Sequence, residues 1–123
     1  MKSKSNPVFR DKKFLTEHIS SIMDFYHPHC IDKEFGGFFH HFRDDGSIYD
    51  TSTRHLVSST RFIFNYSMAS IHFDNDEYIE AAHHGINFLR DYHLDKSTGG
   101  YRWILEGEKA KDSTNYCYGL AFV

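Results

Sequence analysis

One nine-residue segment occurs twice in this chain of 123 residues. Residues 31–39 read IDKEFGGFF and residues 94–102 read LDKSTGGYR, so the two copies lie 63 positions apart (94 minus 31). Segments with the apolar spacing of helices flank each copy. Helical repeats need stacked neighbours to bury their apolar faces. The repeat therefore predicts two units, each consisting of a helix, a Gly-Gly hairpin loop and a second helix.

Four segments carry apolar residues at three- and four-residue steps, which is the spacing of one helix face. The predicted helices cover residues 7–27, 52–73, 75–93 and 114–123, the last being only the start of a helix. Pro7 suits a first turn, and Pro28 is expected to end the first helix. The expected N-caps of the later helices are Ser52 or Thr53, the cluster Asp74–Asp76, and Asp112, Ser113 or Thr114.

Two glycine-containing segments between these helices have the character of hairpins. In residues 36–50, Asp45-Gly46 separates two runs rich in aromatic and β-branched residues, and residues 99–112 repeat this character. The sequence thus predicts an all-α fold of two antiparallel helical pairs with short β-hairpin loops. The chain reaches Val123 within an apolar helix and without a C-cap. We therefore expect either a fragment or a last helix that packs against a partner.

Composition excludes several classes of protein. Lys and Arg number 14 against 17 Asp and Glu, a net charge of -3, which does not suit a nucleic-acid-binding protein. No run of 18 apolar residues predicts a membrane span, and no apolar signal segment follows the basic start. We therefore expect a cytoplasmic chain without a membrane or nucleic-acid partner.

Neither cysteine nor histidine forms a pattern typical of a metal site. The two cysteines, Cys30 and Cys117, are far apart, which also argues against a disulfide scaffold. The ten histidines include three close pairs, but none has the i, i+4 spacing of helical metal ligands. We expect no metal.

Five motifs in order resemble the N-acylglucosamine 2-epimerase family, which includes cellobiose 2-epimerases and mannose-type aldose–ketose isomerases. The motifs are residues 32–38 (DKEFGGF), 44–50 (DDGSIYD), 53–62 (TRHLVSSTRF), 99–103 (GGYRW) and 118–123 (YGLAFV). The resemblance extends from about residue 14 to the end. It implies an (α/α)6 barrel of six inner and six outer helices, with loops over a sugar pocket. A complete member is roughly three times longer, so residues 1–123 would form the N-terminal part of one barrel domain, its first two helical pairs.

The resemblance also implies a reaction. It would be a sugar isomerase or 2-epimerase, moving a proton next to the carbonyl of an open-chain aldose or N-acylhexosamine, with no cofactor in the chemistry. The family's acid and base histidines come from later helical pairs, beyond Val123. The alternative is a catalytically inactive fragment or a sugar-binding remnant. The sequence leaves open which sugar is used and whether the reaction is epimerisation or isomerisation. We expect self-association through uncovered apolar helix faces.

Four residues are candidates for the sugar site. Arg61 lies on the most apolar helix, where an arginine points outward, pairs with a buried acid or faces a polar cavity. In the family, the arginine at this place reaches the substrate oxygen near the reacting carbons, which makes Arg61 the catalytic candidate. Tyr118 and, more weakly, Asn115 are expected to bind substrate from the last helix, with a packed core tyrosine as the alternative for Tyr118. Trp103 would line the pocket mouth, or pack its hairpin against the helices.

Overall fold

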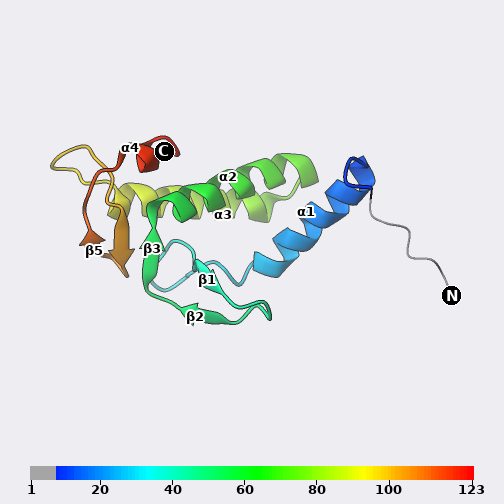
Figure 1. Ribbon diagram of the computed structural model, residues 1–123, viewed down its shortest axis with the longest axis horizontal. Coiled ribbons are helices and arrows are strands. Elements are labelled where there is room, and N and C mark those ends of the chain that lie inside the picture. The colour runs from blue at the N-terminus through cyan, green and yellow to red at the C-terminus, as the bar shows by residue number, and fades with distance from the viewer. Residues whose placement is uncertain (1–7) are drawn as a thin grey trace.

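The computed structural model describes residues 8–123 and has a helix-rich fold with two small sheets (Figure 1). Pro7, expected in the first helical turn, lies outside the described residues. The elements in chain order are α1(Lys12–Tyr26), β1(His41–Phe42), β2(Ile48–Asp50), β3(Thr53–His55), α2(Leu56–Phe73), α3(Asp76–Phe88), the π-helix η1(Leu89–His93), β4(Ile104–Glu106), β5(Lys109–Asp112) and α4(Cys117–Leu120).

Both copies of the repeated segment fold into the same turn. The Asp32 N–H donates to the Gly37 carbonyl at 3.1 Å, and the Asp95 N–H donates to the Gly100 carbonyl at 2.8 Å. The first glycine of each Gly-Gly pair has a positive φ, 90° in the first copy and 77° in the second. A side chain would be strained there, which explains why glycine recurs. Neither Gly-Gly pair lies inside a helix, as the sequence predicted.

Local hydrogen bonds shift the start of the first two helices from the predicted positions. Helix α1 begins at Lys12 because Asp11 Oδ1 accepts the N–H of Phe14 at 2.8 Å. Helix α2 begins at Leu56, not at residue 52, since residues 53–55 form strand β3. His55 rather than Ser52 or Thr53 is its N-cap, with the His55 side chain accepting from the backbone of Val57.

The later helices also differ in their bounds. Asn75 caps α3 as the cluster predicted, but regular α-helix stops at Phe88 and a π-turn completes the predicted segment. Helix α4 begins at Cys117 rather than residue 114, because Asp112 uses its carboxylate to accept the Thr114 N–H in a turn that precedes the helix. None of the three predicted residues caps α4, and its N-cap Tyr116 makes no side-chain capping bond.

The β3–β4–β5 sheet lies at one end of α2 and α3, and the antiparallel pair β1–β2 lies below these helices in the view (Figure 1). The predicted hairpins are present as β1–β2 and β4–β5. The sequence did not predict β3, which pairs with β4 in the register Thr53↔Glu106, Arg54↔Leu105 and His55↔Ile104. This pairing connects the two repeat units immediately before α2.

Helices α2 and α3 lie side by side over most of their length, while α1 extends away from them (Figure 1). The buried core cluster comprises Met23, Cys30, Phe38, Tyr66, Ala69, Tyr78, Ala81 and Ala82. Met23 is the only residue of α1 that is fully buried in the structure described. Helix α1 therefore keeps several apolar side chains exposed, among them Leu15, Ile19 and Ile22. Within residues 8–123, no helix is long and apolar enough to cross a membrane.

Candidate functional site

Helix α2 presents a polar row beside α1. Ser58, Arg61 and Asn65 follow one another at three- and four-residue steps, so they share one helix face. Together with Tyr26 of α1 and His40, they line a cavity of about 210 Å³, called the Arg61 cavity below. Its remaining walls are Ile22, Met23, Phe62 and Tyr66. The cavity combines several hydrogen-bonding side chains with aromatic walls.

Arg61 is exposed on this face, so of the alternatives from the sequence its position argues against a buried ion pair within residues 8–123. Among the described residues, its guanidinium makes no ion pair and no hydrogen bond. Its Cζ lies 5.1 Å from the ring centre of Phe122, just after α4. A cation–π contact leaves the guanidinium donors free in the ring plane. Arg61 therefore faces a cavity and has no buried acid as a partner within residues 8–123.

Tyr118 does not occupy a packed core position. It is 60% exposed, with its ring 6.5 Å from that of Trp103 and 5.2 Å from that of Phe122. Since Phe122 also contacts Arg61, Tyr118 and Arg61 are linked through one shared aromatic ring. Tyr118 is not one of the residues lining the Arg61 cavity.

Trp103 packs between the two repeat units. Its ring lies 4.3 Å from that of His55 at the start of α2 and 4.8 Å from that of Tyr116. A Cβ on Gly119 would come within 2.9 Å of this ring, so α4 is seated directly on the indole. The structure thus shows the packing that the sequence gave as the alternative to a pocket-mouth position.

Asn115 lies before α4 rather than on it. Its Oδ1 accepts the N–H of Tyr101 at 3.0 Å, and its amide lies so close to Gly100 that a Cβ there would come within 2.8 Å. Asn115 therefore supports the second Gly-Gly turn, and the expectation that it shares a helix face with Tyr118 is wrong because α4 begins only at Cys117.

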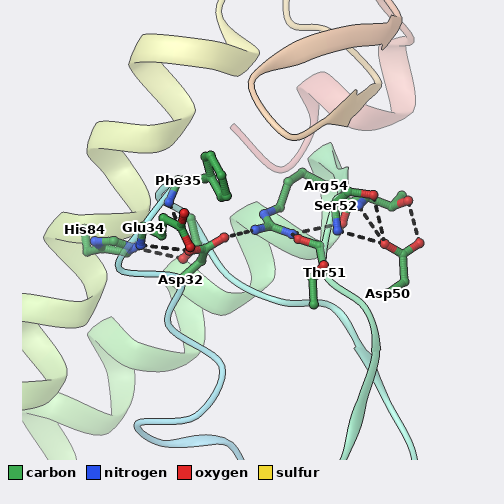
Figure 2. Close-up of polar contacts among 10 residues, drawn as sticks. Asp32, Glu34, Phe35, Asp50, Thr51, Ser52, Arg54 and His84 are labelled. Carbon is green, nitrogen blue, oxygen red and sulfur yellow. Dashed lines mark hydrogen bonds and ion pairs between the residues drawn. The ribbon is translucent and has the colours of Figure 1, made fainter.

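A second polar group, around Asp32 and Arg54, is buried (Figure 2). Arg54 Nη2 lies 2.5 Å from Asp32 Oδ2, and Arg54 Nη1 donates to the carbonyl of Thr51 at 2.9 Å. The other Asp32 oxygen accepts the N–H groups of Glu34 and Phe35. Burial lowers the pKa of Arg54, and the nearby charge of Asp32 opposes that shift. The two side chains pair with each other, as in a structural ion pair, although Arg54 Nε is buried without a partner among the described residues.

An open cavity of about 850 Å³ lies against this ion pair, between the first turn and the second hairpin. Its walls include Glu34, Glu106, Glu108 and Lys109. Asp50, which is close by, accepts from Thr53 and Ser52 (Figure 2). These hydrogen bonds, that of Thr53 first, lower the pKa of the Asp50 carboxyl. The hydroxyl of Ser52, which lines this cavity, also donates to Asp50 Oδ1, at 3.3 Å.

Ser59 and His93 resemble a nucleophile and its base but are sealed in the interior. The Ser59 hydroxyl lies 3.0 Å from His93 Nε2, and His93 Nδ1 lies 2.9 Å from the carbonyl of Arg102. A carbonyl only accepts, so Nδ1 carries the proton and Nε2 accepts from the serine. Burial lowers the pKa of His93 to about 4, and His93 is fully buried, so the pair has no access to substrate.

No group of three or more His, Cys, Asp or Glu side chains is placed to hold a metal ion between residues 8 and 123. Four of the ten histidines have side chains that hydrogen-bond to the backbone instead. These are His40, His55, His84 and His93.

The sequence model of the N-acylglucosamine 2-epimerase (GlcNAc 2-epimerase) family matches residues 37–123, which include the whole of α2 and the Arg61 motif. The chain belongs to this family. The match begins within the first Gly-Gly turn, so it covers most of the first repeat's loop and all of the second repeat's loop.

Two curated relatives are similar to most of this chain. A D-mannose isomerase of Marinomonas mediterranea is 58% identical over 119 residues, which are 97% of this chain and 30% of the relative. A cellobiose 2-epimerase of Eubacterium cellulosolvens is 30% identical over 111 residues, 89% of this chain and 26% of the relative. The chain spans about 30% of the length of these relatives or less.

Solved structures agree with this assignment. A crystal structure of a D-mannose isomerase superimposes with a TM-score of 0.91 at 58% identity, over 96% of this chain and 30% of that one. A cellobiose 2-epimerase from Bacillus thermoamylovorans B4167 superimposes with a TM-score of 0.77 over 89% of this chain and 30% of that one, at 19% identity. The second match shows that the fold is shared even with a protein of low sequence identity.

The sequence analysis did not identify the other hydrogen-bonding residues of the Arg61 cavity, among them Ser58, Asn65 and His40. Ser58 and Asn65 could have been found from their helical spacing to Arg61, had polar rather than apolar periodicity been followed. His40 carried no such signal, because it comes from the loop before β1 and reaches α2 only in the folded chain.

Proposed function

We propose that this chain is the N-terminal part of a sugar isomerase or 2-epimerase, with D-mannose as the favoured substrate. The observation that carries the proposal is the 58% identity to a D-mannose isomerase over 97% of the chain. In this proposal the two helical pairs form the first part of an (α/α)6 ring, and the remaining helices complete the sugar pocket.

The chemistry follows from the substrate. A proton leaves the carbon next to the carbonyl of the opened sugar, and the carbon–hydrogen electron pair moves toward the carbonyl oxygen, giving an enediolate. Return of a proton to the former carbonyl carbon, with the hydroxyl proton of the neighbouring carbon passing to the former carbonyl oxygen, gives the ketose. Return of a proton to the same carbon from the other face gives the epimer. Only protons move, so the reaction needs no cofactor. The resemblance assigns the proton carriers to histidines beyond Val123, whose ordinary pKa suits this task.

Arg61 is the residue that this chain would contribute to the reaction. Its guanidinium is always charged and has free donors in the described part of the chain. Placed at the carbonyl oxygen, it stabilises the negative charge that develops there. Tyr118 would bind the sugar from the neighbouring α4, with Trp103 and Asn115 fixing the loop beneath it.

The test is a fused enzyme. It consists of residues 1–123 followed by the part of the Marinomonas mediterranea D-mannose isomerase that lies beyond the aligned region. We expect the fused enzyme to convert D-mannose to its ketose, and the isolated chain to show no turnover. A fused enzyme that folds but is inactive on D-mannose, cellobiose and N-acetylmannosamine would contradict the proposed function. Turnover by the isolated chain would show that one of its own histidines carries the proton.

A further inference from the structure

His40 is a residue of the Arg61 cavity to which the proposed mechanism gives no role. It comes from the loop before β1, yet it lines the same cavity as Arg61, Ser58 and Asn65. The histidine ring is held from two sides. Its Nδ1 accepts the backbone N–H of His55 at 3.1 Å, and its face stacks on Phe62 at 5.8 Å and an interplanar angle of 13°.

The hydrogen bond to His55 locates the proton on the imidazole. Nδ1 acts as an acceptor, so the neutral ring carries its hydrogen on Nε2. Burial, with a smaller contribution from the charge of Arg54, lowers the pKa of His40 to about 3. His40 is therefore a neutral hydrogen-bond donor at any pH near neutrality, and it is too weak a base to remove a proton from carbon.

The Nε2 donor has no partner. It is buried, and no acceptor lies within hydrogen-bond distance among residues 8–123. Buried polar groups are nearly always hydrogen-bonded, so this donor, in a residue that lines the cavity, indicates an acceptor from outside the described residues. The Arg61 guanidinium, on the same cavity, likewise has no oxygen partner within those residues.

The walls of the cavity indicate which kind of acceptor fits. Of the described residues that line it, none is an Asp or Glu, so these walls offer the Arg61 guanidinium no carboxylate partner. Arg61, His40, Ser58 and Asn65 can all donate hydrogen bonds, while the rings of Phe62 and Tyr26 offer apolar faces. Several donors between apolar and aromatic walls suit a ligand that carries many oxygens, such as a polyhydroxy compound.

We propose that His40 is a substrate-binding residue whose Nε2–H donates to a hydroxyl or carbonyl oxygen of the open-chain sugar that Arg61 holds. This inference rests on the proposed function. It assigns His40 to binding and not to proton transfer, and it makes the loop before β1 part of the sugar site.

The experiment compares two His40 variants in the fused enzyme. His40→Phe keeps a ring that can stack on Phe62 but removes the donor, whereas His40→Gln retains both an acceptor for His55 and an N–H. We expect His40→Phe to lower kcat/KM for D-mannose by about 10- to 100-fold and to weaken inhibition by D-mannitol, an open-chain polyol. His40→Gln should restore most of both.

His41→Phe is the matched control. The Nε2 of His41 is also buried and without a partner in the described chain, but His41 does not line the Arg61 cavity. We expect wild-type kinetics and mannitol inhibition from this variant. If His40→Phe fails to fold, isotope-labelled histidine still gives a readout, because saturating D-mannitol should shift the His40 Nε2–H resonance in the unmutated fused enzyme.

The outcomes separate the two proposals. An inactive unmutated fused enzyme would overturn the proposed function and the role of His40 with it. An active fused enzyme in which His40→Phe keeps wild-type kinetics, or in which mannitol leaves the His40 resonance unmoved, would overturn the role of His40 alone. Equal losses in His40→Phe, His40→Gln and His41→Phe, with Tm falling in parallel, would mark a structural role and also overturn it.

Discussion

Two arginines seven positions apart, Arg54 in β3 and Arg61 in α2, have opposite surroundings. Arg54 is buried, paired with Asp32 and bonded to a backbone carbonyl (Figure 2). Arg61 is exposed, and within the described residues the one contact of its guanidinium with a charged or aromatic group is with the ring of Phe122. Removing one member of a buried ion pair leaves an uncompensated charge, so we expect substitution of Arg54 alone to destabilise the fold. Arg61 contributes no such pair and remains available to a ligand.

The sequence singles out Arg61 as a candidate but does not predict the role of Arg54. The arginine motif of α2 is contiguous, so a resemblance to a family transfers directly to that position. Arg54 acquires its role only through Asp32, which is 22 positions earlier and is brought near by the first Gly-Gly turn. Asn115 and Trp103 illustrate the same limit, since their neighbours come from the opposite side of a turn or from the other repeat unit.

Also at the scale of single residues, the burial of His93 leads us to expect that the stability of the fold depends on pH. Its pKa is lowered from 6.5 to about 4 by burial, so below pH 6.5 the unfolded chain takes up a proton that the folded chain does not. The free energy of unfolding should therefore fall as the pH decreases from 6.5 to about 4, by up to about 1.4 kcal/mol per pH unit for this group.

Urea unfolding of the chain at low concentration, between pH 7 and pH 4, measures this slope. His93→Gln removes the titrating group while keeping a donor and an acceptor, so its slope should be shallower. An equal slope in both proteins would show that His93 is not a source of the acid sensitivity.

At the scale of elements, the repeat was the most informative signal in the sequence. The Asp and Gly-Gly positions predicted two similar turns, and the backbone hydrogen bonds of the two copies match. Helix starts were less predictable, because capping depends on which side chain reaches the first turn, as His55 does for α2. Strand β3 was not predictable, since three residues with the sequence Thr-Arg-His form a strand only when β4 is placed beside them.

Close packing of α2 against α3 depends on Gly85. A Cβ at this position would lie 2.5 Å from Phe38 and 2.6 Å from Ile63. Gly85→Ala gains up to about 1 kcal/mol of helix propensity. The overpacking of the fully buried Phe38 should outweigh this gain and give a net loss of about 1–3 kcal/mol.

The free energy of unfolding of Gly85→Ala tests this prediction, with His83→Ala on the exposed face of α3 as its control. The control should stay within about 0.5 kcal/mol of the unmutated chain. A Gly85→Ala protein as stable as the control would contradict the close packing of the two helices.

At the scale of the whole molecule, apolar side chains remain uncovered on several helices. The large exposed ones on α1 and α2 are Leu15, Ile19, Ile22, Phe25, Phe64, Met68 and Ile71. In a chain that covers about 30% of its relatives, such faces have no neighbours within the described residues. Exposed apolar surface of this kind promotes association.

We therefore expect the isolated chain to self-associate, and the fused enzyme to do so less. Sedimentation velocity at increasing concentration measures both. A sharply monomeric isolated chain at high concentration, with cooperative unfolding, would show that the apolar faces are stable in water without a partner.

The central claim is that this chain supplies the arginine of a sugar-isomerising site, and the turnover of Arg61→Lys in the fused enzyme tests it most directly. Lysine keeps the charge but loses the planar fork, and loss of one donor to a developing oxyanion costs about 10²–10³ in kcat. Arg43→Lys is the matched control, because Arg43 also lies over an aromatic ring, that of Tyr49, but outside the Arg61 cavity. We predict that Arg61→Lys loses kcat by this factor with an unchanged Tm, while Arg43→Lys keeps wild-type turnover. Near-normal turnover of Arg61→Lys would remove Arg61 from the mechanism and contradict the account.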